Sequence, residues 1–259
     1  MKLWSSLEGK NIWVTGGAGH LGGPITAELD RCGAKVLCLD LPGRAESFVA
    51  EHKLSRTAPA SVDLCEIGAV SRGVPELLRT HGTPDAVVHL VFASSSGQRL
   101  EEMSAETFAT TLTKALPPTF EFCRTVAEAM KPRGGGSIVL FSSMYGIVSP
   151  DPRVYVAPMT PNPIDYGANK AAILQMTRYF AVHYGPAKIR FNAITPGPFP
   201  NPKVQETDPA FIQRLSAKTA LQRIGQREEI VGPTLFLLTD SASYVTGQSL
   251  SVDGGWTVM

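Results

Sequence analysis

A cluster of glycines between a short apolar segment and a helical pattern limits how this chain can fold. The cluster, residues 16–23, reads Gly-Gly-Ala-Gly-His-Leu-Gly-Gly, and residues 11–15 before it are rich in β-branched and aromatic side chains. Such a segment predicts a strand. Leu21, Ile25 and Leu29 then recur every four residues, which predicts one apolar face of a helix. A strand, a glycine turn and a helix in this order predict the opening of a βαβ unit.

The same alternation of strands and helices continues along the chain. Residues 35–40 form a continuous apolar run closed by Asp40, which is typical of a strand buried on both faces. Helical spacing appears in residues 104–130 and 171–184, and the other predicted strands are residues 60–64, 85–92, 137–143, 190–195 and 249–252. Strands separated by helices form parallel sheets with right-handed crossovers. We therefore predict an α/β fold with a doubly wound (Rossmann) parallel sheet of about seven strands and helices on both faces.

Length and composition favour a single domain, residues 1–259. A chain of 259 residues can bury one core, and its formal net charge of +1 offers no polyanion-binding surface, so we expect no nucleic-acid partner. The amino terminus lacks the apolar run of a signal peptide or membrane span, so we expect no membrane association and a cytoplasmic location. The cysteines at 32, 38, 65 and 123 lack CxxC spacing and the histidines are scattered, so we predict free thiols and no metal site.

A proline-rich segment, residues 149–163, interrupts the alternation. Its prolines at 150, 152, 158, 161 and 163 exclude a regular helix or a central strand. Strong strand and helix patterns flank the segment closely. We therefore expect an ordered active-site loop and not a domain boundary.

The glycine cluster predicts a dinucleotide site. Gly16, Gly19 and Gly22 allow the backbone to approach a pyrophosphate, while the helix amino end offers free N–H groups and a partial positive charge. Asp40 ends the second strand about 24 residues after Gly16, near the spacing of an acid that binds the adenosine ribose. A carboxylate there repels a 2′-phosphate and favours NAD over NADP, although Arg44 could receive that phosphate and leaves NADP open.

Tyr166 and Lys170 form a candidate acid/base pair. They are four residues apart in a predicted helix, so their side chains lie on one face. A free tyrosine has a pKa of about 10, and a neighbouring ammonium stabilises the phenolate and lowers that pKa. Ser143 ends a predicted strand at the carboxyl edge of the sheet, where open α/β sheets bind ligands. Its hydroxyl could bond a substrate oxygen while Tyr166 transfers the proton.

Several motifs occur together in a fixed order: Thr15-Gly16-x-x-Gly19-x-x-Gly22, Ser143, Tyr166-x-x-x-Lys170, Asn-Ala-Ile-Thr-Pro-Gly at 192–197, and Gly-Gln-Ser-Leu-Ser-Val-Asp-Gly-Gly at 247–255. Together they resemble the short-chain dehydrogenase/reductase family over nearly the whole chain. The resemblance implies a seven-stranded parallel sheet and hydride transfer to or from a nicotinamide. It also implies a homodimer or homotetramer built through long helices.

The resemblance assigns roles to individual positions. It implies that Ser143 polarises the substrate oxygen, that Tyr166 is the general acid/base, and that Lys170 lowers its pKa and holds the nicotinamide ribose. The cofactor-binding residues that it implies are Gly16, Gly19, His20, Leu21, Gly22, Asp40, Leu41, Asp63, Leu64, Leu90, Val91, Tyr166, Lys170, Pro196, Gly197 and Phe199.

The chain departs from the compact branch of this family in four places. His20 and residues 85–90 look like the extended branch, which handles sugar nucleotides. Ala115 stands where many compact members carry a proton-relay asparagine, which puts the usual relay in doubt. The interval between Ser143 and Tyr166 is long, because it contains the proline-rich segment.

We therefore expect an NAD(P)-dependent oxidoreductase that acts on a secondary alcohol or ketone, such as a sugar or another polar small molecule. Arg153, Lys203 and Arg214 lie in segments expected to cover the site, where basic side chains could meet an anionic substrate group. Exposed basic residues are more often only solvated.

Two alternatives stay open. A sugar-nucleotide epimerase or dehydratase that retains its NAD is disfavoured, because few residues follow Gly197 to build a further substrate domain. A non-catalytic NAD-binding regulator is disfavoured by the presence of Ser143, Tyr166 and Lys170, since a sensor requires no acid/base.

Overall fold

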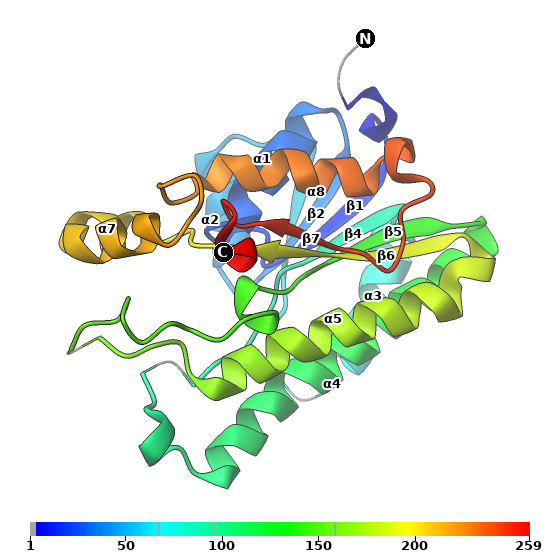
Figure 1. Cartoon of the computed structure of the whole chain (residues 1–259). Helices are drawn as coiled ribbons and strands as arrows, with labels where there is room; N and C mark the ends of the chain where they lie inside the picture. The colour runs from blue at the N-terminus through cyan, green and yellow to red at the C-terminus, as the bar shows by residue number, and fades with distance from the viewer. Residues whose placement is uncertain (1–3, 67, 96, 158) are drawn as a thin grey trace.

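Within the described residues, seven parallel strands form one sheet in the order β3-β2-β1-β4-β5-β6-β7 (Figure 1). The computed structural model describes residues 4–259 except 67, 96 and 158. The strands are β1 (Asn11–Thr15), β2 (Lys35–Asp40), β3 (Thr57–Ser61), β4 (Ala86–His89), β5 (Gly136–Phe141), β6 (Ile189–Pro196) and β7 (Ser249–Val252). The order runs outward in both directions from β1 and β4, which pair with each other. The predicted doubly wound sheet is confirmed, and its switch point lies between these two strands.

Helices cover both faces of the sheet (Figure 1). One face carries α1 (Gly22–Arg31) and α8 (Val231–Leu238), and the other carries α3 (Ala69–His81), α4 (Ala105–Met130) and α5 (Ile164–Tyr184). The helix α2 (Arg44–Glu51) packs on β3. Two further helices, α6 (Pro202–Thr207) and α7 (Pro209–Ala217), extend past the carboxyl edge of the sheet. Among the helices of the described residues, none has the length and apolarity needed to cross a membrane.

Successive strand residues belong to two separate cores, one on each face of the sheet. Trp13 and Leu37 pack in the core that α3, α4 and α5 cover, whereas Ile12 and Val36 pack in the core beneath α1 and α8. These four side chains are each at most 3% exposed. Burial on both faces explains why the strand segments are continuous apolar runs in the sequence.

Two strands differ from their predicted bounds. The third strand, predicted at residues 60–64, is Thr57–Ser61, and the fourth, predicted at residues 85–92, is only Ala86–His89. β3 lies at the edge of the sheet and pairs with β2 alone, and its exposed Pro59 and Ser61 and small alanines give it a weak strand pattern. The apolar residues after both strands are not sheet residues. They turn into a cleft at the carboxyl edge, where Leu64 and Leu90 are found.

The proline-rich segment forms a loop, as predicted. Its described residues contain no helix or strand, and α5 begins directly after it at Ile164. Of the prolines named in the prediction, Pro158 lies outside the described residues.

Candidate active site

The glycine turn brings the amino end of α1 against the end of β1. Gly16 has a positive φ of 68°, and its N–H donates to the carbonyl of Leu39 at 2.7 Å. A Cβ on Gly22 would overlap the Gly16 carbonyl, and a Cβ on Gly17 would lie 2.8 Å from the Val14 carbonyl. The turn therefore accepts glycine alone at these positions.

The same turn fits a pyrophosphate. In the described residues no side chain caps α1 at Leu21, and although Gly23 donates to the Gly19 carbonyl and Pro24 has no N–H, the Leu21 and Gly22 N–H groups stay available for an anionic ligand. Nearby, His20 Nε2 is buried and has no hydrogen-bond partner among the described residues. Burial, with a further contribution from the charge of Arg227, lowers the pKa of His20. A neutral histidine with an unused ring nitrogen is suited to contact a bound cofactor.

Asp40 fastens the end of β2 to the glycine turn. Its Oδ2 accepts a hydrogen bond from the Ala18 N–H at 3.0 Å, and its Oδ1 accepts one from the Leu41 N–H at 2.9 Å. The Arg44 guanidinium lies 3.6 Å from Oδ1, and the side chains of Asp40 and Arg44 are 5% and 54% exposed. The carboxylate is thus held in place and partly neutralised, and its remaining lone pairs can accept further hydrogen bonds.

A cleft of about 750 Å³ opens at the carboxyl edge of the sheet. It brings together every predicted site residue: Gly16, Gly19, His20, Leu21, Gly22, Asp40, Leu41, Asp63, Leu64, Leu90, Val91, Ser143, Tyr166, Lys170, Pro196, Gly197 and Phe199. The prediction did not include Cys65, Phe92 and Ser142, which also line the cleft. Each follows the end of a strand within a few residues, so position after a strand was the available signal.

Ser143, Tyr166 and Lys170 meet at one end of the cleft. Ser143 follows β5, and its Oγ accepts a hydrogen bond from the Tyr145 N–H at 3.1 Å. Lys170 is only 4% exposed, and its Nζ donates to the Phe141 carbonyl at 2.8 Å. Nζ also lies 5.7 Å from the centre of the Tyr166 ring. Burial lowers the pKa of Lys170 to about 7.

The pKa of Tyr166 differs from expectation. Burial raises it above the ordinary value, and a hydrogen bond with Ser143 opposes this rise without cancelling it. The sequence had predicted a pKa lowered by Lys170. The lysine ammonium faces the ring of Tyr166 and donates to a backbone carbonyl, so the cost of burying the phenolate outweighs its attraction.

Contacts between β5 and α5 hold this group in place. Ser142 Oγ donates to the Lys170 carbonyl at 2.7 Å. Gly146 approaches the same backbone so closely that a Cβ would lie 2.8 Å from the Lys170 carbonyl carbon and oxygen. The first turns of α5 are therefore fixed against the end of the sheet, with Tyr166 and Lys170 on the cleft side.

His89 forms a buried polar connection behind the cleft. Its Nδ1 lies 2.8 Å from Thr15 Oγ1 and its Nε2 lies 3.2 Å from Thr119 Oγ1. Burial, with a smaller contribution from the charge of Lys170, lowers the pKa of His89 to about 3. The neutral ring therefore links β1, β4 and α4 without carrying a charge.

A separate cluster covers the outer side of the site; we name it the covering cluster. Its buried members are Met144, Tyr145, Val154, Phe211, Leu215, Ile224 and Trp256, and Tyr166 packs against them. The hydroxyls of Tyr145 and Tyr155 are 2.6 Å apart. This cluster joins the proline-rich loop to α7.

Basic residues beside the covering cluster contact other residues of the proline-rich loop. Asp151 accepts ion pairs from Arg153 at 2.8 Å and from Lys218 at 2.9 Å. Arg214 Nε donates to the Val154 carbonyl at 2.7 Å. Arg153 and Arg214, considered from the sequence as partners of an anionic substrate, therefore hold the cover together.

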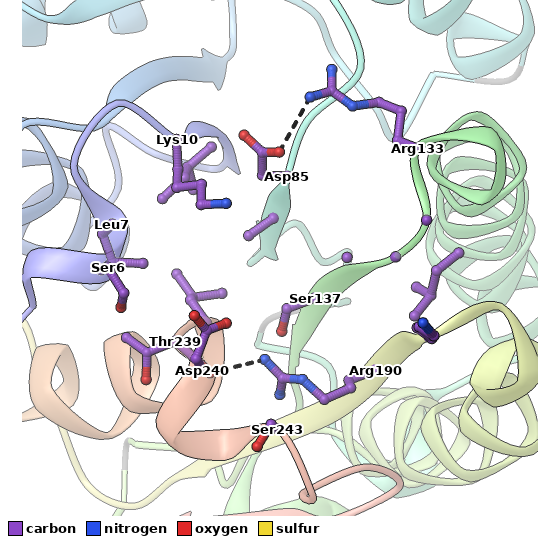
Figure 2. Close-up of a pocket in the computed structure, with 18 of the residues that line it drawn as sticks. Ser6, Leu7, Lys10, Asp85, Arg133, Ser137, Arg190, Thr239, Asp240 and Ser243 are labelled. Carbon is purple, nitrogen blue, oxygen red and sulfur yellow. Dashed lines mark hydrogen bonds and ion pairs between the residues drawn. The ribbon is translucent and has the colours of Figure 1, made fainter.

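A second hollow, of about 600 Å³, lies at the opposite, amino edge of the sheet (Figure 2). Arg133 pairs there with Asp85 at 3.4 Å, and Arg190 donates to the carbonyls of Thr239 and Val245. The carboxyl ends of α4 and α5 meet this edge. Basic side chains at helix carboxyl ends offset the helix dipoles, so their presence has a structural explanation.

Comparison with known proteins supports the same interpretation. A family profile described as enoyl-(acyl carrier protein) reductase matches residues 17–257. A probable galactose dehydrogenase of Rhizobium meliloti (strain 1021) is 30% identical over 255 residues, covering 96% of this chain and 95% of its own. An NAD-dependent glycerol dehydrogenase of Listeria innocua is 27% identical over 250 residues, covering 95% and 92%.

Solved structures agree with these relatives. A short-chain dehydrogenase from Leptospira borgpetersenii with bound NAD⁺ has a TM-score of 0.87 and 29% identity, covering 99% of this chain and 96% of its own. A putative NAD(P)-dependent gluconate 5-dehydrogenase from Beutenbergia cavernae with bound NADP has a TM-score of 0.87 and 27% identity, covering 99% and 100%. The chain belongs to the short-chain dehydrogenase/reductase family, which confirms the prediction of an NAD(P)-dependent oxidoreductase of alcohols or ketones.

Proposed function

We propose that this protein moves a hydride between NAD and a secondary alcohol or ketone, with Tyr166 as its general acid/base. The observation that carries this proposal is the meeting of Ser143, Tyr166 and Lys170 in the same cleft as the glycine turn, with Lys170 Nζ 5.7 Å from the centre of the Tyr166 ring. When bound, the nicotinamide supplies the acceptor or donor of the hydride.

The chain's own residues handle the proton. Ser143 holds the substrate oxygen, and the Tyr166 hydroxyl gives a proton to that oxygen during reduction or receives one during oxidation. Because burial raises the pKa of Tyr166, the phenol is protonated at neutral pH and ready to act as an acid. Oxidation requires the phenolate, and the nearby Lys170 ammonium is the group that favours it.

We propose NAD as the preferred cofactor. The support is Asp40, whose buried carboxylate lies in the cleft beside Leu41 and would repel a 2′-phosphate. Arg44 is the residue that would favour NADP, but its guanidinium lies beside that same carboxylate. The ion pair leaves less positive charge for a phosphate.

We propose a sugar or another polar alcohol or ketone as the substrate class. The support is that two relatives are named for galactose and glycerol, and that hydroxyl-bearing Ser142, Ser143 and Tyr166 line the cleft, where they can bond substrate hydroxyls.

We further propose a cytoplasmic homodimer or homotetramer. Phe120 on α4 and Tyr179 and Val182 on α5 are 49%, 69% and 81% exposed. Apolar groups on neighbouring long helices are what a partner copy would cover.

Replacing Tyr166 by Phe tests the acid/base assignment. We expect turnover to fall by about 10³-fold, while NAD affinity, measured by calorimetry, stays within about twofold because the ring and its packing remain. Tyr244→Phe is the matched control, since Tyr244 is fully exposed outside the cleft. A Tyr166→Phe enzyme that kept a tenth or more of the wild-type rate would overturn the proposal.

A further inference from the structure

Phe92 is an exposed aromatic residue in the cleft. β4 ends at His89, and the chain then passes along the cleft with Phe92 54% exposed. Its carbonyl accepts a hydrogen bond from the Cys65 thiol at 3.7 Å. The exposed ring is therefore available to the side chains and ligands of the cleft.

The ring of Phe92 contacts two of the three candidate catalytic residues. Lys170 Nζ lies 5.0 Å from the ring centre, closer than it lies to the Tyr166 ring. The Phe92 and Tyr166 rings meet edge to face, with centroids 5.8 Å apart and planes at 80°. Phe92 therefore joins the lysine and the tyrosine through one aromatic surface.

The Lys170 ammonium has few other groups to stabilise it. Its Nζ donates to the Phe141 carbonyl, and no ion pair with a carboxylate is found for it in the described part of the chain. The titratable groups around it are His89 from β4, Tyr166 from α5, and, near the tyrosine, Tyr145 and Tyr155. None of these is an anion at neutral pH. Beyond the Phe141 carbonyl, the negative face of the Phe92 ring is therefore the nearest electrostatic support that this buried cation finds.

We propose that Phe92 is a positioning residue whose ring face keeps the Lys170 ammonium charged beside Tyr166. Through Lys170 it sets the pH at which Tyr166 exchanges its proton. This inference rests on the proposed roles of Tyr166 and Lys170. It adds a residue that the motifs of the chain did not single out.

Fluorinated phenylalanines at position 92 test the contact directly. One, two and three fluorine atoms withdraw charge from the ring face while preserving its shape and its cover of Lys170. The Lys170 pKa is read in the cofactor-free protein by ¹⁵N-lysine NMR, with Lys170→Met identifying the signal. We expect the pKa to fall stepwise, by about one across the series. A pKa that stays constant across the series overturns the proposal.

The pH dependence of kcat/KM for alcohol oxidation tests the coupling to Tyr166. With less charge on Lys170 the Tyr166 phenolate is less favoured. The acid limb of the profile, which is the fall of kcat/KM at low pH, should therefore move to higher pH as fluorine is added. The matched control is the same series at Phe120, a half-exposed ring on α4 that does not line the cleft, which should leave both readings unchanged. A Lys170 titration that shifts without any movement of the acid limb overturns the coupling. Full activity of Tyr166→Phe instead contradicts the proposed function, and the NMR titration still decides the contact.

Discussion

The Ala18 N–H donates to the Asp40 carboxylate across 3.0 Å, so the residue that we propose for cofactor choice also ties the glycine turn to β2. One side chain would therefore serve both the proposed cofactor choice and local stability. These two roles can be separated, because one depends on charge and the other only on a hydrogen-bond acceptor.

Replacing Asp40 by Ala should lower both the stability of the protein and its preference for NAD over NADP. The Ala18 and Leu41 N–H groups lose their acceptor, which should reduce the free energy of unfolding by about 1–3 kcal/mol. The ratio of kcat/KM for NAD to that for NADP should fall by about tenfold, since the repulsion of a 2′-phosphate is gone. Asp40→Asn retains one of the two oxygen acceptors, so it should recover part of the lost stability but not the cofactor preference. An Asn variant with unchanged preference would refute the charge argument.

Gly22→Ala should disrupt the glycine turn. An added Cβ would overlap the Gly16 carbonyl, so the turn must shift and its N–H groups lose their alignment toward a pyrophosphate. We expect NAD affinity, measured by fluorescence titration, to fall by at least about tenfold. Gly232→Ala in α8 is the control, because no atom lies within 4 Å of its added Cβ. That variant should bind NAD normally and gain about 0.5–1 kcal/mol of stability. Equal effects at both sites would contradict the steric argument.

Lys170 should make stability depend on pH. Its pKa is about 7 in the folded protein and 10.5 as an ordinary lysine, so between these values the unfolded chain binds more protons than the folded one. The free energy of unfolding therefore rises with pH across this window, by an amount on the order of 5 kcal/mol.

Lys170→Met removes this dependence. In urea unfolding at pH 6, 8 and 10, the free energy of unfolding of Lys170→Met should exceed that of the wild type most at pH 6. This difference should become smaller as the pH rises. Parallel stability curves for the two proteins would show that burial of the ammonium has no such cost.

Lys218→Met should weaken the attachment of the proline-rich loop to the end of α7. Lys218 and Arg153 hold Asp151 between them and depress the pKa of its carboxyl below the ordinary range. The carboxylate therefore stays ionised at neutral pH, and the pair is lost only in acid as pH falls through that depressed value. We expect KM for the substrate to rise several-fold with little change in Tm, because partly exposed ion pairs contribute little to global stability. Lys203→Met on α6 provides the comparison. A Tm loss without any change in KM would place the role of Lys218 in folding.

Much of the sheet could be predicted from the sequence because its strands are buried on both faces. Residues 35–40 and 11–15 match β2 and β1 at both ends. The edge strand β3 could not be located as well, since it contains Pro59 and two small alanines in place of large apolar residues. The helices α2 and α3 were not predicted. α3 contains Gly73 and Pro75, which weaken a helical signal that packing on the sheet then overrides.

The residues of the cleft could be predicted because each belongs to a motif or follows a strand. The motifs do not show which residues far apart in the sequence contact one another in the folded protein. The ion pair of Asp151 with Lys218 spans distant parts of the chain, and the Phe92 ring meets Lys170 only after folding. The raised pKa of Tyr166 has the same origin, because it depends on how deeply the ring is buried and on where the lysine points.

The covering cluster includes Tyr166 but none of the residues of the glycine turn. Mutations in the cover can therefore reshape what the enzyme accepts while the nucleotide half stays intact. After a gene duplication, one copy could therefore change its substrate while it keeps the same nicotinamide cofactor. Directed evolution of new activities should begin in the proline-rich loop and α7.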